Sequence, residues 1–190
     1  MTVFPVGHYM GERPAHGQHV VRVGLEHRLL SADEFGVWVL AHGTAENGRR
    51  AWAVSDVLAL AADSSLPGGP AAVDRLVALG ALAVADEPRR FAESYRLRPL
   101  LVGLGNSPSE PDRYRVGFPG LPPVAELDAM AYELWQWGHL APSLWHTCEV
   151  REKVAAGLGA PVSVVDLLDG LLGDVRELLL NSCAYLDRVR

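Results

Sequence analysis

Two stretches of this sequence decide its fold, because one repeats the other. Residues 31–42 read SADEFGVWVLAH, and residues 128–139 read DAMAYELWQWGH. An aromatic residue, a tryptophan and a histidine recur at matching positions, as Phe35, Trp38 and His42 in the first stretch and Tyr132, Trp135 and His139 in the second. The spacing of three and then four residues places each set on one face of an α-helix. The sequence therefore predicts a chain built from two copies of one small unit, with core tryptophans and with histidines at helix ends.

The composition is typical of a globular protein. The chain has 190 residues, of which 49% are hydrophobic and 21% charged, enough for one large domain or two small ones. No apolar run of about 18 residues is present, so we expect no membrane span. The first residues do not resemble a secretion signal, which favours the cytoplasm. The two cysteines, Cys148 and Cys183, indicate neither a disulfide framework nor a zinc site.

Charge is distributed unevenly along the chain. The net charge of −6 argues against a surface that attracts nucleic acid everywhere. Residues 1–105 hold ten Arg and eleven Asp or Glu, whereas residues 106–190 hold seven Lys or Arg and twelve Asp or Glu. Only the first part of the chain is therefore a candidate for contact with a polyanion.

The first copy continues beyond its tryptophan helix. Ser31 and Glu34 have the spacing of a capping box, and Gly43 suits the end of that helix. Patterns further along predict a strand at 19–24, helices at 55–62 and 70–79, a stop at Gly80, and strands at 81–85 and 91–97 joined by a tight loop. The last two strands are expected to pair as a hairpin.

This order of elements resembles the winged helix-turn-helix unit of many bacterial regulators. The residues that carry the resemblance are 55–62, 70–79, Gly80 and the hairpin 81–97. The resemblance implies a mainly α fold with small β-hairpins (α+β), made of two winged-helix-like units in tandem.

The expected organisation is an N-terminal arm at 1–18, a first unit at 19–99, a linker at 100–113 and a second, degenerate unit at 114–190. In the second unit, residues 115–117 echo residues 22–24, and Val175, Leu178 and Leu179 echo Val73, Leu76 and Val77. A helix near 143–157 has no counterpart in the first unit, and the returning strand of a wing is missing.

Four arginines are the candidates for DNA contact that the resemblance implies. Arg75 is the one basic residue on the third helix, Arg89 and Arg90 lie at the expected wing tip, and Arg96 lies on the returning strand. The alternatives are a third helix that only packs and a turn that is polar because it is solvated.

An excess of large apolar side chains in the second unit suggests an interface. The candidates are Leu140, Leu144, Trp145, Leu171 and Leu172. They would serve a homodimer or another protein partner. Alternatively, they fill the contact between the two copies.

No pattern in the sequence indicates catalysis. His146 lies close to Cys148, but residues two apart on a helix point to different faces. No phosphate-binding glycine loop and no nucleophile or zinc motif is present, so we expect no enzyme, no cofactor and no metal.

Three functions follow, in order of preference. The first is a DNA-binding transcriptional regulator whose acidic second unit mediates dimer or partner contacts. The alternative is a non-enzymatic protein-interaction module on the same scaffold without DNA binding. An enzyme or ligand sensor with a pocket between the copies has the least support.

Overall fold

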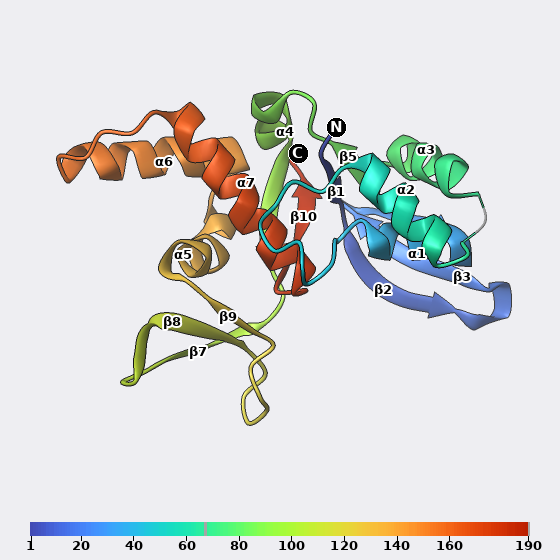
Figure 1. Cartoon of the computed structure of the whole chain (residues 1–190), viewed down its shortest axis with the longest axis horizontal. Helices are drawn as coiled ribbons and strands as arrows, with labels where there is room; N and C mark the ends of the chain where they lie inside the picture. Colours follow the sequence, from blue (N-terminus) through green and yellow to red (C-terminus); the bar gives the residue numbers. More distant parts are fainter. Residues whose placement is uncertain (67, 190) are drawn as a thin grey trace.

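The chain folds into two halves that repeat one order of elements (Figure 1). The computed structural model describes residues 1–66 and 68–189, so the last residue of the predicted second unit lies outside the described residues. In each half a short strand is followed by three further strands, by helices that begin with the tryptophan helix, and by a closing strand. The mixed α+β class that the sequence indicates is confirmed.

The first half begins with a strand, at the third residue of the chain. Its elements are β1 (Val3–Pro5), β2 (His8–Arg13), the short helix η1 (Pro14–His16), β3 (Gln18–Val23), β4 (Glu26–Leu30), α1 (Ala32–Leu40), α2 (Val54–Asp63), α3 (Gly69–Leu79) and β5 (Leu82–Val84). Strands β2, β3 and β4 form an antiparallel sheet, and β5 pairs antiparallel with β1. The first and last strands thus close the half on itself.

The second half follows a connecting helix, α4 (Pro88–Ser94). Its elements are β6 (Tyr95–Pro99), β7 (Val102–Ser107), β8 (Glu110–Gly117), β9 (Ala125–Leu127), α5 (Ala129–Trp137), η2 (Gly138–Leu140), α6 (Leu144–Gly157), α7 (Val164–Leu180) and β10 (Ala184–Arg188). Strands β7, β8 and β9 form the sheet, and β10 pairs antiparallel with β6. Helix α6 and the start of α7 extend away from the first half, at the left of Figure 1.

The two tryptophans occupy equivalent places. Trp38 in α1 is 6% exposed and Trp135 in α5 is 7% exposed. Each indole N–H donates to a backbone carbonyl, Trp38 to Val6 over 3.2 Å and Trp135 to Cys183 over 3.0 Å. Val6 follows the first strand of its half and Cys183 precedes the last strand of its half. Each tryptophan helix is therefore anchored beside the pair of strands that closes its half, although by a different carbonyl.

The sheet register corrects one of the predicted internal matches. His19 pairs with Leu30, and Tyr114 pairs with Leu127, in each case the residue before the N-cap of the tryptophan helix. His19 and Tyr114 are thus equivalent, and each stacks on the first aromatic residue of its helix, at centroid distances of 4.0 and 4.5 Å. The predicted echo between residues 22–24 and 115–117 is consequently out of register by two residues.

The expected wing hairpin is wrong. Residues 82–84 pair with β1, and residues 95–99 pair with β10, so the two segments do not pair with each other. Residues 91–94 belong to helix α4 instead, which begins at Pro88, a residue favoured in the first turn of a helix. Pairing with distant strands has replaced the local hairpin.

Residues 1–18 are not a loose arm, and residues 100–113 are not a linker. Val3 and Phe4 of β1 are fully buried, and β2 belongs to a three-stranded sheet. Strand β7 and the start of β8 occupy the predicted linker, where its Gly, Pro and Ser residues accompany irregular pairing in the β7–β8 ladder. Glycine-rich composition marked these distortions of the strand, not a connection between domains.

The two halves share one hydrophobic core and meet along β10. Gly7 N–H donates to the carbonyl of Leu186 over 2.8 Å, and the Tyr185 hydroxyl accepts a 2.7 Å hydrogen bond from Arg22. None of the helices in residues 1–66 and 68–189 has the length and apolar character needed to cross a membrane.

Candidate interaction site between α5 and α6

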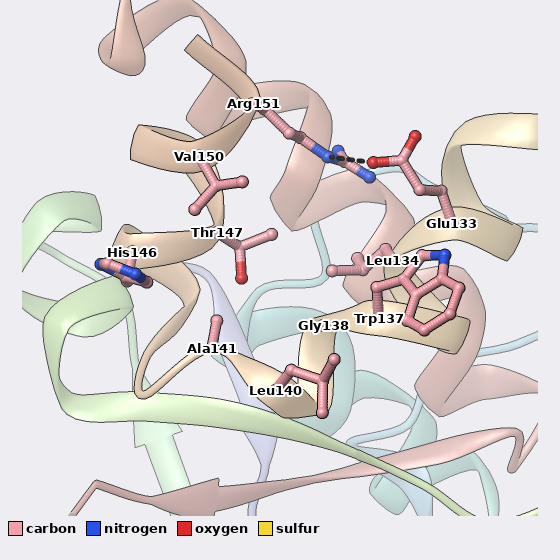
Figure 2. A pocket seen from close by; sticks show the side chains of 10 residues that line it. All are labelled: Glu133, Leu134, Trp137, Gly138, Leu140, Ala141, His146, Thr147, Val150 and Arg151. Carbon is pink, nitrogen blue, oxygen red and sulfur yellow. Dashed lines mark ion pairs between the residues drawn. The ribbon is translucent and has the colours of Figure 1, made fainter. Parts of the chain in front are cut away.

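A cavity of about 330 Å³ opens between α5, η2 and α6. Figure 2 shows Trp137 and Leu140 on the α5–η2 side and Thr147 and Val150 on the α6 side. Leu134, Gly138 and Ala141 complete the apolar wall, and Glu133, His146 and Arg151 are the charged or titratable residues around it. The volume lies in the range of sites that take one small molecule or one large side chain.

The sequence produces this cavity through the change from α5 to η2. Trp135 faces the core, so Trp137, two positions further on, points to a different face and is 55% exposed. A β-carbon at Gly138 would lie 2.8 Å from Leu134 Cδ1, so a larger residue there would require the Leu134 side chain to shift. The close packing leaves Leu140 68% exposed at the edge of the cavity.

Helix α6 continues the apolar surface beyond the cavity. Val150, Val154 and Leu158 are exposed and lie four residues apart, which places them along one side of the helix. With Trp137 and Leu140 they form what we call the α5–α6 patch. Clustered exposed side chains of this kind mark interaction sites, whereas isolated ones are common on any protein.

One end of the cavity is polar and buried. Arg151 is 9% exposed and donates from Nη2 to the carbonyl of Met130 over 2.9 Å. Its Nη1 lies 3.6 Å from Asp174 Oδ2, and its Nε lies 3.8 Å from Glu133 Oε1 (dashed in Figure 2). Nε itself is buried without a hydrogen-bond partner in the part of the chain that the structure describes. Burial raises the pKa of Asp174, opposed by the nearby guanidinium groups of Arg49 and Arg151.

The predicted interface residues divide into three kinds, which are exposed, fully buried and partly buried. Leu140 is exposed at the cavity, but Leu144 and Leu171 are fully buried in the core, so their assignment to an interface is wrong. Leu172 is partly buried against the core. Trp145 is partly buried, donates to Glu149 over 2.9 Å and lies under the Arg89 guanidinium at 4.7 Å. Whether each of these apolar side chains is exposed depends on the direction in which it points, which the sequence does not give.

The stripe on α6 was missed, although the sequence contains a signal for it. Val150, Val154 and Leu158 recur every four residues within a segment that has no counterpart in the first half. That spacing alone indicates a helical face. It does not indicate that the face is uncovered.

The four predicted DNA-contact arginines do not form one surface element. Each lies near a carboxylate: Arg75 at 3.8 Å from Glu34, Arg89 at 2.8 Å from Glu93, Arg90 at 4.0 Å from Glu87 and Arg96 at 3.8 Å from Asp187. They belong to α3, α4 and β6, and α3 lies apart from α4 in Figure 1. Because α4 replaces the hairpin, the predicted wing tip does not exist.

The histidine and cysteine of α6 are not a nucleophilic pair. Cys148 is fully buried, and burial raises the pKa of its thiol to about 11. His146 is instead paired with Glu149, with 3.2 Å between Nδ1 and Oε2. Among residues 1–66 and 68–189, no group of three or more His, Cys, Asp or Glu side chains is placed to hold a metal ion.

Comparisons of this chain with protein-family models, with curated proteins and with solved structures find no match.

Proposed function

We propose that this protein is a non-enzymatic interaction module that receives a segment of a partner protein on the α5–α6 patch. The observation that supports the proposal is the exposure of Trp137 and Leu140 beside an apolar cavity. A well-packed pocket that accepts one large apolar side chain is a common centre of binding energy in protein interfaces.

The chemistry of the cavity defines the partner segment. An apolar side chain would fill the space between Trp137, Leu140 and Val150. Glu133 and Arg151 at one end could pair with polar backbone or side-chain groups of the same segment. Tryptophan and arginine are enriched among the residues that dominate binding energy, and both line this cavity.

The DNA-binding regulator is the alternative and remains a prediction. Its support is that Arg75, Arg89 and Arg90 are exposed. Of the elements that carry the winged-helix resemblance, the second and third helices and the stop at Gly80 are present. Against it, the hairpin expected after the third helix is absent, and each arginine has an acidic neighbour.

A binding comparison tests the proposal. Proteins that co-purify with the tagged wild-type chain from its native host would be identified and their affinities measured with purified components. Leu140→Asp should weaken binding at least about 30-fold, because it places a charge in the apolar centre of the contact. Leu25→Asp is the matched control, since Leu25 is also an exposed leucine but lies at the β3–β4 turn of the other half.

Equal binding by both variants would contradict the proposal. Retention on a heparin column at low salt tests the DNA-binding alternative independently. Retention that is lost when Arg89 and Arg90 are replaced by Ala would support DNA contact, whereas passage without retention would remove it.

A further inference from the structure

Arg176 in α7 is buried and forms no ion pair with any of the described residues. It is 2% exposed, donates from Nη2 to the carbonyl of Val3 over 2.8 Å, and lies 4.4 Å from the centre of the Phe4 ring. Among residues 1–66 and 68–189, no carboxylate lies within 4.0 Å of its guanidinium. Arginine is rarely this buried unless it is paired, because moving a charge out of water is costly.

A second cavity, of about 160 Å³, lies against Arg176. It forms where β1 and the segment after α1 meet α7, and its polar lining consists of Thr2, Arg49, Asp169 and Arg176. The Arg49 guanidinium is occupied by Asp128, Asp174 and Glu177. By contrast, Nε and Nη1 of Arg176 donate to none of the described residues. Their N–H groups are therefore free to donate to a ligand.

We propose that this cavity binds a small oxyanion, a phosphate or carboxylate group, with Arg176 as its main donor and the Thr2 hydroxyl as a second. A guanidinium presents parallel N–H groups that match two oxygens of such an anion. The cavity has room for a group of that size. Because the Arg49 guanidinium is already paired with acids, Arg176 is the cation of the lining that remains for an anion. The one carboxylate of the lining, that of Asp169, is exposed.

The protonation state of Arg176 is compatible with this role. Burial lowers the pKa of its guanidinium to about 10, and the charge of Asp56 acts in the opposite direction. Arg176 therefore stays cationic at neutral pH. The Phe4 ring covers one face of the guanidinium, and the Val3 carbonyl accepts a hydrogen bond from Nη2. A bound anion would accept hydrogen bonds from the remaining N–H groups.

Titration of the purified protein with inorganic phosphate and, separately, with acetate tests the proposal. Binding is followed by calorimetry and by thermal unfolding, at constant ionic strength set with sodium chloride. We expect saturable binding of at least one of the two anions that chloride does not reproduce. Which of the two binds more tightly distinguishes a phosphate from a carboxylate ligand.

Variants assign the binding to this cavity. Arg176→Met should weaken it at least tenfold, and Asp169→Asn should strengthen it about threefold by removing the one negative charge of the lining. Arg113→Met is the control, because Arg113 is an exposed arginine on β8 that does not line this cavity, and it should leave binding unchanged.

No anion effect beyond that of chloride, or an unchanged effect in Arg176→Met, would overturn the proposal. If Arg176→Met does not fold, Ala51→Phe provides a second route, because Ala51 lines the cavity and is exposed. A bulky ring there should block the anion, and binding that survives it would also overturn the proposal.

Discussion

Trp38 and Trp135 each combine a buried ring with one hydrogen bond from the indole N–H. Their surroundings differ in one respect. The Cys183 carbonyl accepts a hydrogen bond from the Trp135 indole and a second one, of 2.9 Å, from Leu100 N–H. The Val6 carbonyl accepts a hydrogen bond from the Trp38 indole and from no other donor among residues 1–66 and 68–189. Loss of the indole donor should lower the free energy of unfolding more when it leaves a buried carbonyl without any donor than when a second donor remains.

Replacing each tryptophan by phenylalanine should therefore destabilise the protein unequally. We expect Trp38→Phe to cost about 2–3 kcal/mol and Trp135→Phe about 1–2 kcal/mol in the free energy of unfolding. Urea denaturation measures both. Trp137→Phe is the control and should stay within about 0.5 kcal/mol, because Trp137 is exposed. Equal losses at 38 and 135 would contradict the difference in carbonyl pairing.

His42 makes the protein sensitive to acid. Its Nδ1 lies 3.1 Å from the Trp38 carbonyl and 3.2 Å from the Val39 carbonyl, so Nδ1 carries the proton of the neutral ring. Burial lowers the pKa of His42 from 6.5 to about 4, although the two backbone hydrogen bonds raise it. Between these two values the unfolded chain binds a proton that the folded chain does not, so stability rises with pH across this window.

We expect His42 to account for about 2 kcal/mol of unfolding free energy lost between pH 7 and pH 5. His42→Gln, which keeps an N–H donor but does not titrate, should flatten the pH dependence of the urea midpoint. His27→Gln removes an exposed histidine and should leave the slope as in wild type. A steep slope that persists in His42→Gln would show that another group is responsible.

Helices α3 and α7 end in the same way with different residues. Ala81 N–H donates to Leu76 and Cys183 N–H donates to Leu178, each over 2.9 Å, so the predicted match of Leu76 with Leu178 holds at this helix end. The turn needs a left-handed residue, which is Gly80 with φ 69° in the first half and Ser182 with φ 53° in the second. Glycine adopts this conformation without strain, but serine does not.

The two positions should respond to substitution in opposite directions. Ser182→Gly should stabilise the protein by about 0.5–1 kcal/mol. Gly80→Ala should destabilise it by at least about 1 kcal/mol, because its φ is positive and a β-carbon there would collide with the Arg188 guanidinium. Thermal and urea unfolding measure both effects. A loss of stability in Ser182→Gly would mean that the Ser182 side chain makes a contribution larger than its backbone strain.

At the scale of the whole molecule, one exposed arginine ties the halves together. Arg49, from the segment between α1 and α2, donates to Asp128 over 2.7 Å and to Glu177 over 2.8 Å. Its Nη1 lies 3.2 Å from Asp174, which is buried and which Arg151 also approaches. Arg49 thus connects the first half to the start of α5 and to α7 at once.

Removing the Arg49 side chain should lower the free energy of unfolding by more than the loss of one exposed ion pair does. Arg49→Met leaves Asp174 buried with only Arg151 nearby, and we expect a loss of about 1–3 kcal/mol in urea denaturation. Arg50→Met is the matched control, since Arg50 is the neighbouring exposed arginine and should change stability by less than about 0.5 kcal/mol. Similar effects of both substitutions would argue that Arg49 contributes only at the surface.

The sequence by itself determined the local features. The capping box of the first helix forms as predicted, with Ser31 Oγ accepting from Glu34 N–H over 3.2 Å and Glu34 accepting from Ser31 N–H over 2.9 Å. The repeated aromatic spacing located the two tryptophan helices. Caps and helix periodicity depend on residues three or four apart, which a single sequence displays directly.

Only the tertiary structure decided the strand partners and the exposed surface. Strand β1 pairs with β5 and β6 pairs with β10, so each closing strand finds its partner about 80 to 90 residues away, and the adjacent segment that looked like a hairpin became α4. The same holds for the site, because Leu144 and Leu140 are both apolar and differ only in what packs on them. Pairing and burial between distant segments depend on the packing of the whole chain, and local sequence does not record that packing.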